Sequence, residues 1–197
     1  MAVLHTLKCV TMGMPALIFG GHPLCRAGDE RLAMRSIGQA ELIQIKSDAF
    51  GSGESIPTQY TADGQNISPP ISWHSIAGGI ESFALLVEDP DAPTPNPFVH
   101  WLAYNIPGWA TGIPEAIAHD PQLEQPHMLQ GKNSARKIGY IGCAPPKGDS
   151  PHDYHFQLFA LDRILGLEPG AGRSDLMKAM KGHVVAAGDL IGTYQRS

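Results

Sequence analysis

The chain has 197 residues, of which 43% are hydrophobic and 17% charged, a balance typical of a folded globular domain with a sizeable core. Its formal net charge is −5, and no cluster of Lys and Arg stands out, so the composition argues against a nucleic-acid-binding protein. No apolar run reaches the ~18 residues of a membrane span, so an integral membrane protein is not predicted either.

Residues 1–38 are predicted to be an N-terminal extension, and residues 39–197 a single domain. Within the extension, residues 9–21 are mostly apolar and resemble a weak signal-peptide core, although Pro15 interrupts them and little positive charge precedes them. Three cysteines cannot all pair within one chain, and they lack zinc-site spacing: Cys9, Cys25 and Cys143. We expect reduced thiols and a cytoplasmic protein, with export as the alternative if the apolar segment is a signal.

The first half of the domain is predicted to hold four strands separated by Gly- and Pro-rich turns. The first covers residues 42–46. The second, residues 67–73, is expected at a sheet edge because its paired prolines lack the N–H donors that a central strand needs. The third, residues 83–87, is almost wholly apolar and is expected inside a sheet, and residues 99–106 form the fourth.

The second half of the domain begins with a long irregular stretch, residues 110–137, which is expected to lie on the surface and to hold one or two helical turns. A Gly- and Pro-rich loop at residues 138–148 then leads to the clearest strand of the chain, residues 151–162. The final strand is predicted at residues 184–194, with a break at Gly188.

One convincing helix is predicted, close to the C-terminus. Ser174 is a good N-cap for residues 175–181, an acid stands in the first turn, and Gly182 follows the last turn. Several short strands with turn signals between them, together with one late helix, favour a mainly β fold: an antiparallel β-sandwich with a few short helices.

Acidic and imidazole side chains stand at the ends of two predicted strands. Asp89 and Asp91 follow the buried strand in a Pro-punctuated turn, and His100 lies near the start of the next strand. If these strands are neighbours, the three side chains meet at one edge of the sheet. A capped turn and an ordinary strand histidine are the alternative interpretation of the same residues.

The order and spacing of four segments resemble the phosphatidylethanolamine-binding protein family, which includes the Raf kinase inhibitor proteins of animals and flowering regulators of plants. The segments are Asp63 to Pro70 before Trp73, Asp89 to Pro93 with His100, Gly139 to Tyr154, and Met177 to Val184. The last of them is similar to the corresponding segment of the small bacterial branch. The resemblance covers about residues 42 to 195 and leaves the first ~40 residues outside it.

The resemblance implies a sandwich of two antiparallel sheets with a small anion-accepting pocket at one end. By motif matching, eight residues would line the pocket: Asp89, Asp91, Pro93, His100, Ala144, Pro146, His152 and Tyr154. Family members bind phosphate-like groups there, and many bind and inhibit other proteins. No catalytic reaction is common to the family, so a non-enzymatic protein without a cofactor is expected. A protease, a kinase or a second copy of the chain remain open as protein partners.

The residue types suit such a pocket. Imidazole N–H, tyrosine O–H and backbone N–H groups can all donate to a phosphate-like oxygen. Asp89 or Asp91 would accept from one nitrogen of His100 or His152, which would fix the tautomer of that ring.

Two positions depart from the family pattern. Asp153 stands where the family usually has Arg, but strand alternation places it on the opposite face from His152 and Tyr154. In addition, Cys143 and Ala144 stand where bacterial relatives tend to have a Pro-Cys pair.

The competing hypothesis is a small hydrolase at the same pocket. Its nucleophile would be Cys143, although the surrounding loop offers no helix N-terminus to lower the thiol pKa. Alternatively, four side chains without a recognisable metal motif would hold a metal: Asp89, Asp91, His100 and His152.

Overall fold

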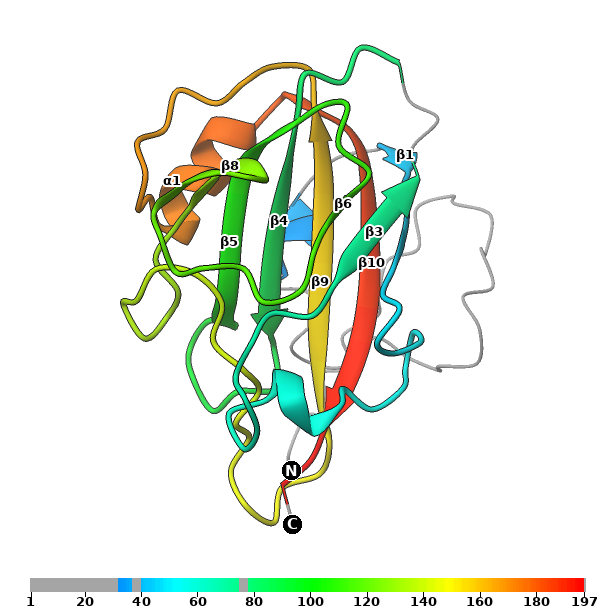
Figure 1. Cartoon of the computed structure of the whole chain (residues 1–197), viewed down its shortest axis with the longest axis vertical. Helices are drawn as coiled ribbons and strands as arrows, with labels where there is room; N and C mark the ends of the chain where they lie inside the picture. Colours follow the sequence, from blue (N-terminus) through cyan, green and yellow to red (C-terminus); the bar gives the residue numbers. More distant parts are fainter. Residues whose placement is uncertain (1–31, 37–39, 75–77, 197) are drawn as a thin grey trace, which may run out of the picture.

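The computed structural model describes residues 32–36, 40–74 and 78–196, so the signal-like residues 9–21, Cys9 and Cys25 lie outside the described residues. Two sheets form the molecule (Figure 1). The larger has seven strands in the order β1 (Glu41–Leu42), β10 (Val184–Tyr194), β9 (His152–Leu161), β4 (Ser82–Asp89), β5 (Phe98–Pro107), β8 (His127–Gln130) and β7 (Gln122–Glu124). The smaller has the order β2 (Gln44–Lys46), β3 (Ile71–His74) and β6 (Gly112–Ile113).

The predicted class, a mainly β sandwich with a helix near the C-terminus, is confirmed. Three short helical elements complete the described chain: η2 (Ala33–Ser36), η3 (Thr58–Tyr60) and α1 (Arg173–Met180). Every strand pair is antiparallel except β1 with β10. Among the described residues, no helix combines the length and apolarity that crossing a membrane would require.

Strand β4 lies in the middle of the larger sheet and explains the apolar run seen in the sequence. All eight of its residues are buried, and it pairs antiparallel with β5 on one side and β9 on the other. Phe83, Leu85 and Val87 face the inner core, towards the smaller sheet, whereas Ala84 and Leu86 belong to a second core on the outer face. Both faces of the strand are covered, so alternation with polar residues is absent.

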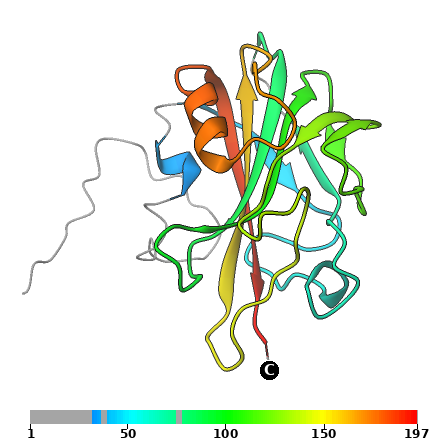
Figure 2. The ribbon, with the colours of Figure 1, turned by 90° about the vertical axis from the view of Figure 1, so that its left-hand side faces the viewer.

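The two sides of the larger sheet are covered by different elements. Turned by 90° in Figure 2, the molecule shows α1 and η2 on one side of the sheet and the strands of the smaller sheet on the other. The outer core includes Leu176 and Met180 from α1 and Ala33 from η2. We use "inner face" and "outer face" of the larger sheet in this sense below.

The predicted first strand is divided between the two sheets. β1 pairs with β10, β2 pairs with β3, and the chain changes sheets at Ile43. Gly188 makes this crossing possible, because a Cβ atom at that position would lie 2.3 Å from the Ile43 carbonyl oxygen. The predicted break at Gly188 was therefore wrong: β10 runs through it, and its irregularity lies between Val184 and Ala186.

Two further expectations were wrong. The strand expected at a sheet edge begins only at Ile71, after the prolines, and it lies between β2 and β6. Because Pro69 and Pro70 precede the paired residues, their missing donors do not matter. The stretch of residues 110–137 contains β6, β7 and β8 rather than helical turns.

The late helix was predicted correctly in position, although its N-cap was not. Gly172 is the N-cap residue, and the Asp175 carboxylate accepts a hydrogen bond from the Gly172 N–H at 3.3 Å. An acid in the first turn thus satisfies a backbone donor that has no partner inside the helix.

Candidate functional site

The strand directions bring the predicted acids and imidazoles to one end of the sheet. Because β4 runs antiparallel to β5 and β9, its last residue, Asp89, lies beside the first residues of both neighbours. His100 is near the start of β5, and His152 and Tyr154 are at the start of β9. This end, at the bottom of Figure 1, also receives the end of β10 and the loop that precedes β9. We call Asp89, His100, His152 and Tyr154 the acid–histidine cluster.

A β-bulge turns His100 towards the cluster. Val87 is opposite Trp101 and Glu88 is opposite Val99, so β5 has one extra residue, His100, between these pairs. As a result Trp101 faces the inner core while Val99 faces the outer one. The His100 ring also lies on the inner side, edge-on to Tyr154 at a centroid distance of 5.2 Å. Bulges are common beside functional sites because they re-aim side chains in this way.

Asp89 is the buried centre of the cluster. Its Oδ2 atom is 2.9 Å from Nδ1 of His152, so the carboxylate accepts the Nδ1–H and orients the ring. Its Oδ1 atom accepts the backbone N–H groups of Asp91 and Ala92 at 2.8 and 2.9 Å. The carboxylate therefore shapes the turn after β4 and fixes His152, as predicted for one of the two acids.

Asp91 has a different structural role. Its Oδ2 atom accepts the backbone N–H of Asp153 at 2.9 Å and so joins the turn after β4 to β9. Asp153 itself precedes Tyr154 on the strand, where the alternate residues Tyr154 and Phe156 belong to the inner core. Its side chain therefore belongs to the outer face, as strand alternation predicted.

His100 is held by a backbone carbonyl rather than by an acid. Its Nδ1 atom is 2.7 Å from the oxygen of Ile141, which can only accept, so Nδ1 carries the hydrogen. Burial lowers the pKa of His100 below its ordinary value of 6.5, although the Ile141 carbonyl and the Asp89 charge act in the opposite direction. The neutral ring then presents Nε2 as an acceptor, whereas the sequence had predicted a donor.

Tyr154 provides the hydroxyl of the cluster. The side chain is 1% exposed, and its hydroxyl makes no well-formed hydrogen bond, although the Cys143 thiol and the Asp89 carboxylate lie close enough to interact with it. Burial raises the pKa of Tyr154 well above its ordinary value of 10, and the neighbouring Cys143 and Asp89 raise it further. The phenol is therefore protonated and remains a hydrogen-bond donor at every physiological pH.

Cys143 lies beside the same groups and is also buried. Burial raises the pKa of Cys143 well above its ordinary value, and the negative charge of Asp89 raises it further. The side chain is therefore a neutral thiol, whereas a nucleophile or a metal ligand would be a thiolate.

The remaining predicted residues lie on the loops that flank the cluster. Pro93 follows the turn after β4, Ala144 and Pro146 precede β9, and all three are exposed. Asp149, from the loop before β9, places its Oδ2 atom 3.7 Å from Nε2 of His152. The structure thus separates the eight predicted residues into a buried group and an exposed rim.

The loop before β9 is held in place by two residues that the sequence analysis did not identify. The Gly142 N–H donates to Oδ1 of Asn66 at 2.6 Å, and Asn66 has a φ of 57°, in the left-handed region. A Cβ atom on Gly142 would lie 2.5 Å from the Thr61 carbonyl carbon. An Asn and a Gly in Gly/Pro-rich segments were the available signal, but their pairing over 76 residues was not visible in the sequence.

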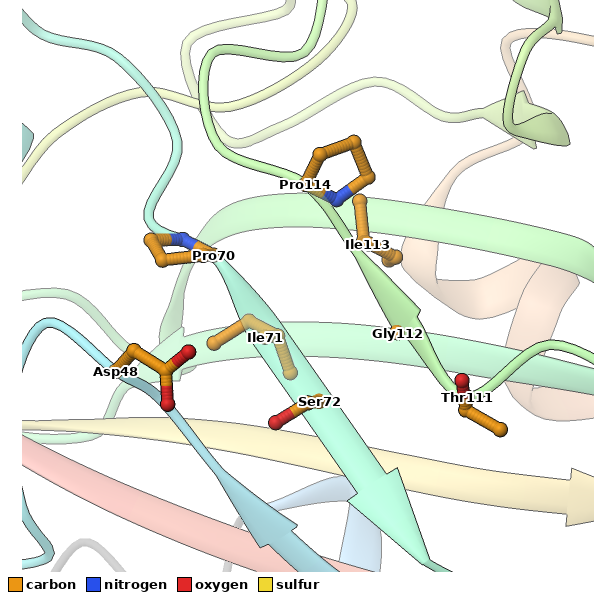
Figure 3. Close-up of a pocket in the computed structure, with 8 residues that line it drawn as sticks. All are labelled: Asp48, Pro70, Ile71, Ser72, Thr111, Gly112, Ile113 and Pro114. Atoms are coloured by element: carbon orange, nitrogen blue, oxygen red, sulfur yellow. The ribbon is translucent and has the colours of Figure 1, made fainter.

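Two surface hollows lie away from the cluster. One, of about 270 Å³, is lined by residues next to β3 and β6 (Figure 3). It offers one carboxylate, Asp48, and the hydroxyls of Ser72 and Thr111, but no cationic side chain, so it suits an anion poorly. The other, of about 260 Å³, lies beside β7 and β8. Across the described residues, no group of three or more His, Cys, Asp or Glu side chains is arranged to hold a metal ion.

Curated relatives are similar to this chain over most of their length. The UPF0098 protein PH1269 of Pyrococcus horikoshii is 40% identical over 199 residues, an alignment that covers 100% of both chains. A UPF0098 protein of Methanothermobacter thermautotrophicus is 44% identical over 78% of this chain and 99% of its own. Both relatives are archaeal, and others are bacterial, for example that of Aquifex aeolicus.

Solved structures show the same fold. The crystal structure of the putative phosphatidylethanolamine-binding protein homolog CT736 from Chlamydia trachomatis has a TM-score of 0.71 and 35% identity, covering 80% of this chain and 100% of that one. Escherichia coli YbcL, described as a new member of the mammalian PEBP family, has a TM-score of 0.73 and 29% identity, over 79% of this chain and 99% of its own.

A family model agrees with these likenesses. The model described as phosphatidylethanolamine-binding protein matches residues 46–195, which include both sheets from β3 onwards and the whole acid–histidine cluster. The fold, the relatives and the family model point in the same direction, and this chain belongs to the phosphatidylethanolamine-binding protein family.

Proposed function

We propose that this protein is a non-enzymatic binding protein that takes a small phosphate-like anion at the acid–histidine cluster. The observation that carries the proposal is the Tyr154 hydroxyl, which is buried and protonated and makes no well-formed hydrogen bond to its neighbours Cys143 and Asp89. Buried polar groups are nearly always hydrogen-bonded, and an exception next to two oriented imidazoles is best explained by a ligand oxygen that completes the set.

The hydrogen-bonding roles define the kind of anion. Tyr154 donates, and neutral His100 accepts at Nε2 because its Nδ1–H is used by Ile141. A matching ligand therefore needs an acceptor oxygen and a hydroxyl, as a monohydrogen phosphate has. A fully ionised phosphate would suit the site less, because the Asp89 carboxylate lies nearby and would repel it.

Size is a second restriction on the ligand. His100 and His152 are each 4% exposed, so only a small group reaches them without displacement of the loop 144–151, in which all residues except Pro145 are exposed. A phosphate head group fits this restriction better than an extended lipid does. The family description names phosphatidylethanolamine, whose phosphodiester has acceptor oxygens for Tyr154 but no hydroxyl for His100, so a phosphate monoester matches the site better.

The state of the thiol favours binding over hydrolysis. A hydrolase would need a thiolate near an available base, but Cys143 is a buried neutral thiol. His152 is held by Asp89, and both oxygens of Asp89 already accept hydrogen bonds. This supports a site that is rigid and suited to recognition.

Calorimetric titration with inorganic phosphate and with phosphoethanolamine tests the proposal. Wild type is compared with Tyr154→Phe and His100→Ala, and His183→Ala is the matched control. His183 is a histidine paired with Asp162 at the opposite end of the β9–β10 pair. Binding should weaken in both cluster variants and not in the control. Equal affinities in all four proteins, or no binding to wild type, would overturn the proposal.

Regulation of another protein through this site is the second part of the proposal. Four residues around the cluster are at least partly exposed: Asp91, Pro93, Ala144 and Pro146. A protein partner that contacts them would bind differently when the anion site is occupied. A pull-down with wild type and with Tyr154→Phe, each with and without phosphate, tests this. Retention of the same partners in all four experiments would separate partner binding from the anion site.

A further inference from the structure

A second polar group is buried on the outer face of the larger sheet, away from the acid–histidine cluster. Glu88 and Gln157 are each 0% exposed, on the neighbouring strands β4 and β9. The Gln157 side-chain amide donates to Oε2 of Glu88 at 2.7 Å, and the guanidinium of Arg173, from α1, donates to Oε1 at 2.5 Å. A buried carboxylate needs such donors, because an unpaired charge inside a protein is strongly unfavourable.

The segment Leu32–Ser36 provides two further donors to this group. The backbone N–H of Ala33 donates to Oε2 of Glu88 at 3.0 Å, and the N–H of Met34 donates to Oε1 of Gln157 at 2.7 Å. Two consecutive backbone groups are thus bound by side chains 55 and 123 residues away along the chain. Ala33 is 0% and Leu32 is 3% exposed, and Ala33 belongs to the outer core.

We propose that Glu88 and Gln157 form a binding site for peptide backbone that holds Leu32–Ser36 as a strap over the outer face. The strap closes the outer core beside α1, as Figure 2 shows for η2 and the helix. Its removal would expose Ala33 and Leu32 and would leave Glu88 with one donor fewer. Proteolytic trimming of the N-terminus should therefore stop before Leu32, because the strap belongs to the folded unit although it precedes the segment matched by the family model.

Limited trypsin digestion of the full chain tests the strap, because Arg31 and Arg35 lie just before it and within it. Ala33→Pro removes the N–H that Glu88 accepts, at the first position of η2, where proline is compatible with a helical turn. Ala33→Ser keeps the N–H and is the matched control. Wild type and the control should resist cleavage after Arg35, while Ala33→Pro should be cut there. Equal rates of cleavage after Arg35 in all three proteins would refute the strap.

Hydrogen exchange gives a second readout, in the wild-type protein and in a variant of Glu88. The amides of Ala33 and Met34 should be protected in wild type. Glu88→Gln should accelerate the exchange of Ala33, whose N–H donates to Glu88, roughly 10- to 100-fold, the effect of losing a hydrogen bond to a buried charged group. Unprotected amides in wild type would overturn the proposal. Protection that depends on protein concentration would do the same, because it would mean that a second copy provides the segment.

Discussion

Tyr154 shows how one side chain can be assigned to binding rather than to stability. A buried hydroxyl without a well-formed hydrogen bond contributes little to the fold, and its desolvation costs about 1–3 kcal/mol. Its neighbours in the cluster are held by other groups: His152 by Asp89, and His100 by Ile141. Removal of the tyrosine hydroxyl should therefore weaken ligand binding without lowering the stability of the fold.

The variant Tyr154→Phe should therefore lose affinity and keep its stability. Phosphate binding is expected to weaken about 10- to 100-fold, because a hydrogen bond to a charged ligand contributes about 1.5–3 kcal/mol. The free energy of unfolding without ligand should stay equal or rise slightly. Calorimetry and urea unfolding measure the two quantities. A stability loss of about 2 kcal/mol or more with unchanged affinity would mean that the hydroxyl is structural.

His100 makes stability depend on pH. Its pKa is lowered in the folded protein, so below the ordinary value of 6.5 the unfolded chain binds more protons than the folded one. Its contribution to stability is complete above that value and is lost as the pH falls through the folded-state pKa. Comparison of wild type with His100→Gln by urea unfolding at pH 7.5 and pH 5 isolates this histidine from the other titrating groups.

Wild type should lose more stability than His100→Gln between these pH values, by up to about 1.4 kcal/mol per pH unit. Identical slopes for the two proteins would show that His100 keeps its ordinary pKa in the folded state. A steeper slope for the variant would show that folding raises the pKa of His100 rather than lowering it, so that the folded protein favours the charged ring.

The composition of the cluster could be predicted from the sequence, but its hydrogen bonds only in part. Asp89 and His152 are a side-chain pair, which residue chemistry predicts. His100 is held by a backbone carbonyl, and every residue has one, so Ile141 gave no signal. Glu88, directly after the apolar run 83–87, was also missed, because two of its partners come from α1 and η2. Its third partner, Gln157, is on the neighbouring strand β9.

Among the elements, the loop before β9 controls the geometry of the cluster. It provides the Ile141 carbonyl for His100, and it is joined to residues 61–66 through Gly142 and Asn66. Gly142 is required there because a Cβ atom would overlap the backbone of Thr61 and Ala62, at 2.5 and 2.6 Å. The site therefore depends on a close backbone approach as well as on its own side chains.

Gly142→Ala should weaken both stability and phosphate binding, because the loop must move away from Thr61 and withdraw Ile141 from His100. Overpacking of this kind costs about 1–3 kcal/mol. Gly166→Ala is the control, since a Cβ atom there has no neighbour within 4 Å. Thermal unfolding and calorimetry of both variants check the prediction. If Gly142→Ala behaves like Gly166→Ala, the loop is not a determinant of the site.

Strands were predictable from the sequence where they are long or where burial of both faces gives an unbroken series of apolar residues. β4, β5 and β9 have 8, 10 and 10 residues, and each was found close to its true position. β6, β7 and β8 have only 2 to 4 residues, too few for a periodic pattern to appear. The change of sheet at Ile43 was invisible because it depends on Gly188, far away in the chain.

At the scale of the whole molecule, the larger sheet separates two buried polar groups. Its inner face and strand ends hold the acid–histidine cluster, and its outer face holds the strap and α1. Strand β9 takes part in both regions. Its Asp153 N–H donates to Asp91 beside the cluster, and its Gln157 accepts the N–H of Met34 in the strap. A ligand at the cluster should therefore stabilise the molecule as a whole.

Phosphate should raise the midpoint of thermal unfolding of wild type. At a free concentration of about 100 times the dissociation constant, the expected stabilisation is about 2.7 kcal/mol. Tyr154→Phe at the same phosphate concentration should gain much less, and chloride at equal ionic strength controls for the general effect of salt. Equal shifts in wild type and Tyr154→Phe would assign the effect to non-specific binding of the anion.

The most direct test of the anion site is a crystal structure of the wild-type protein soaked in inorganic phosphate. We predict tetrahedral density within hydrogen-bonding distance of the Tyr154 hydroxyl and next to the His100 ring. Continuous protein packing around an unoccupied hydroxyl at saturating phosphate, or phosphate bound only elsewhere on the surface, would contradict the account.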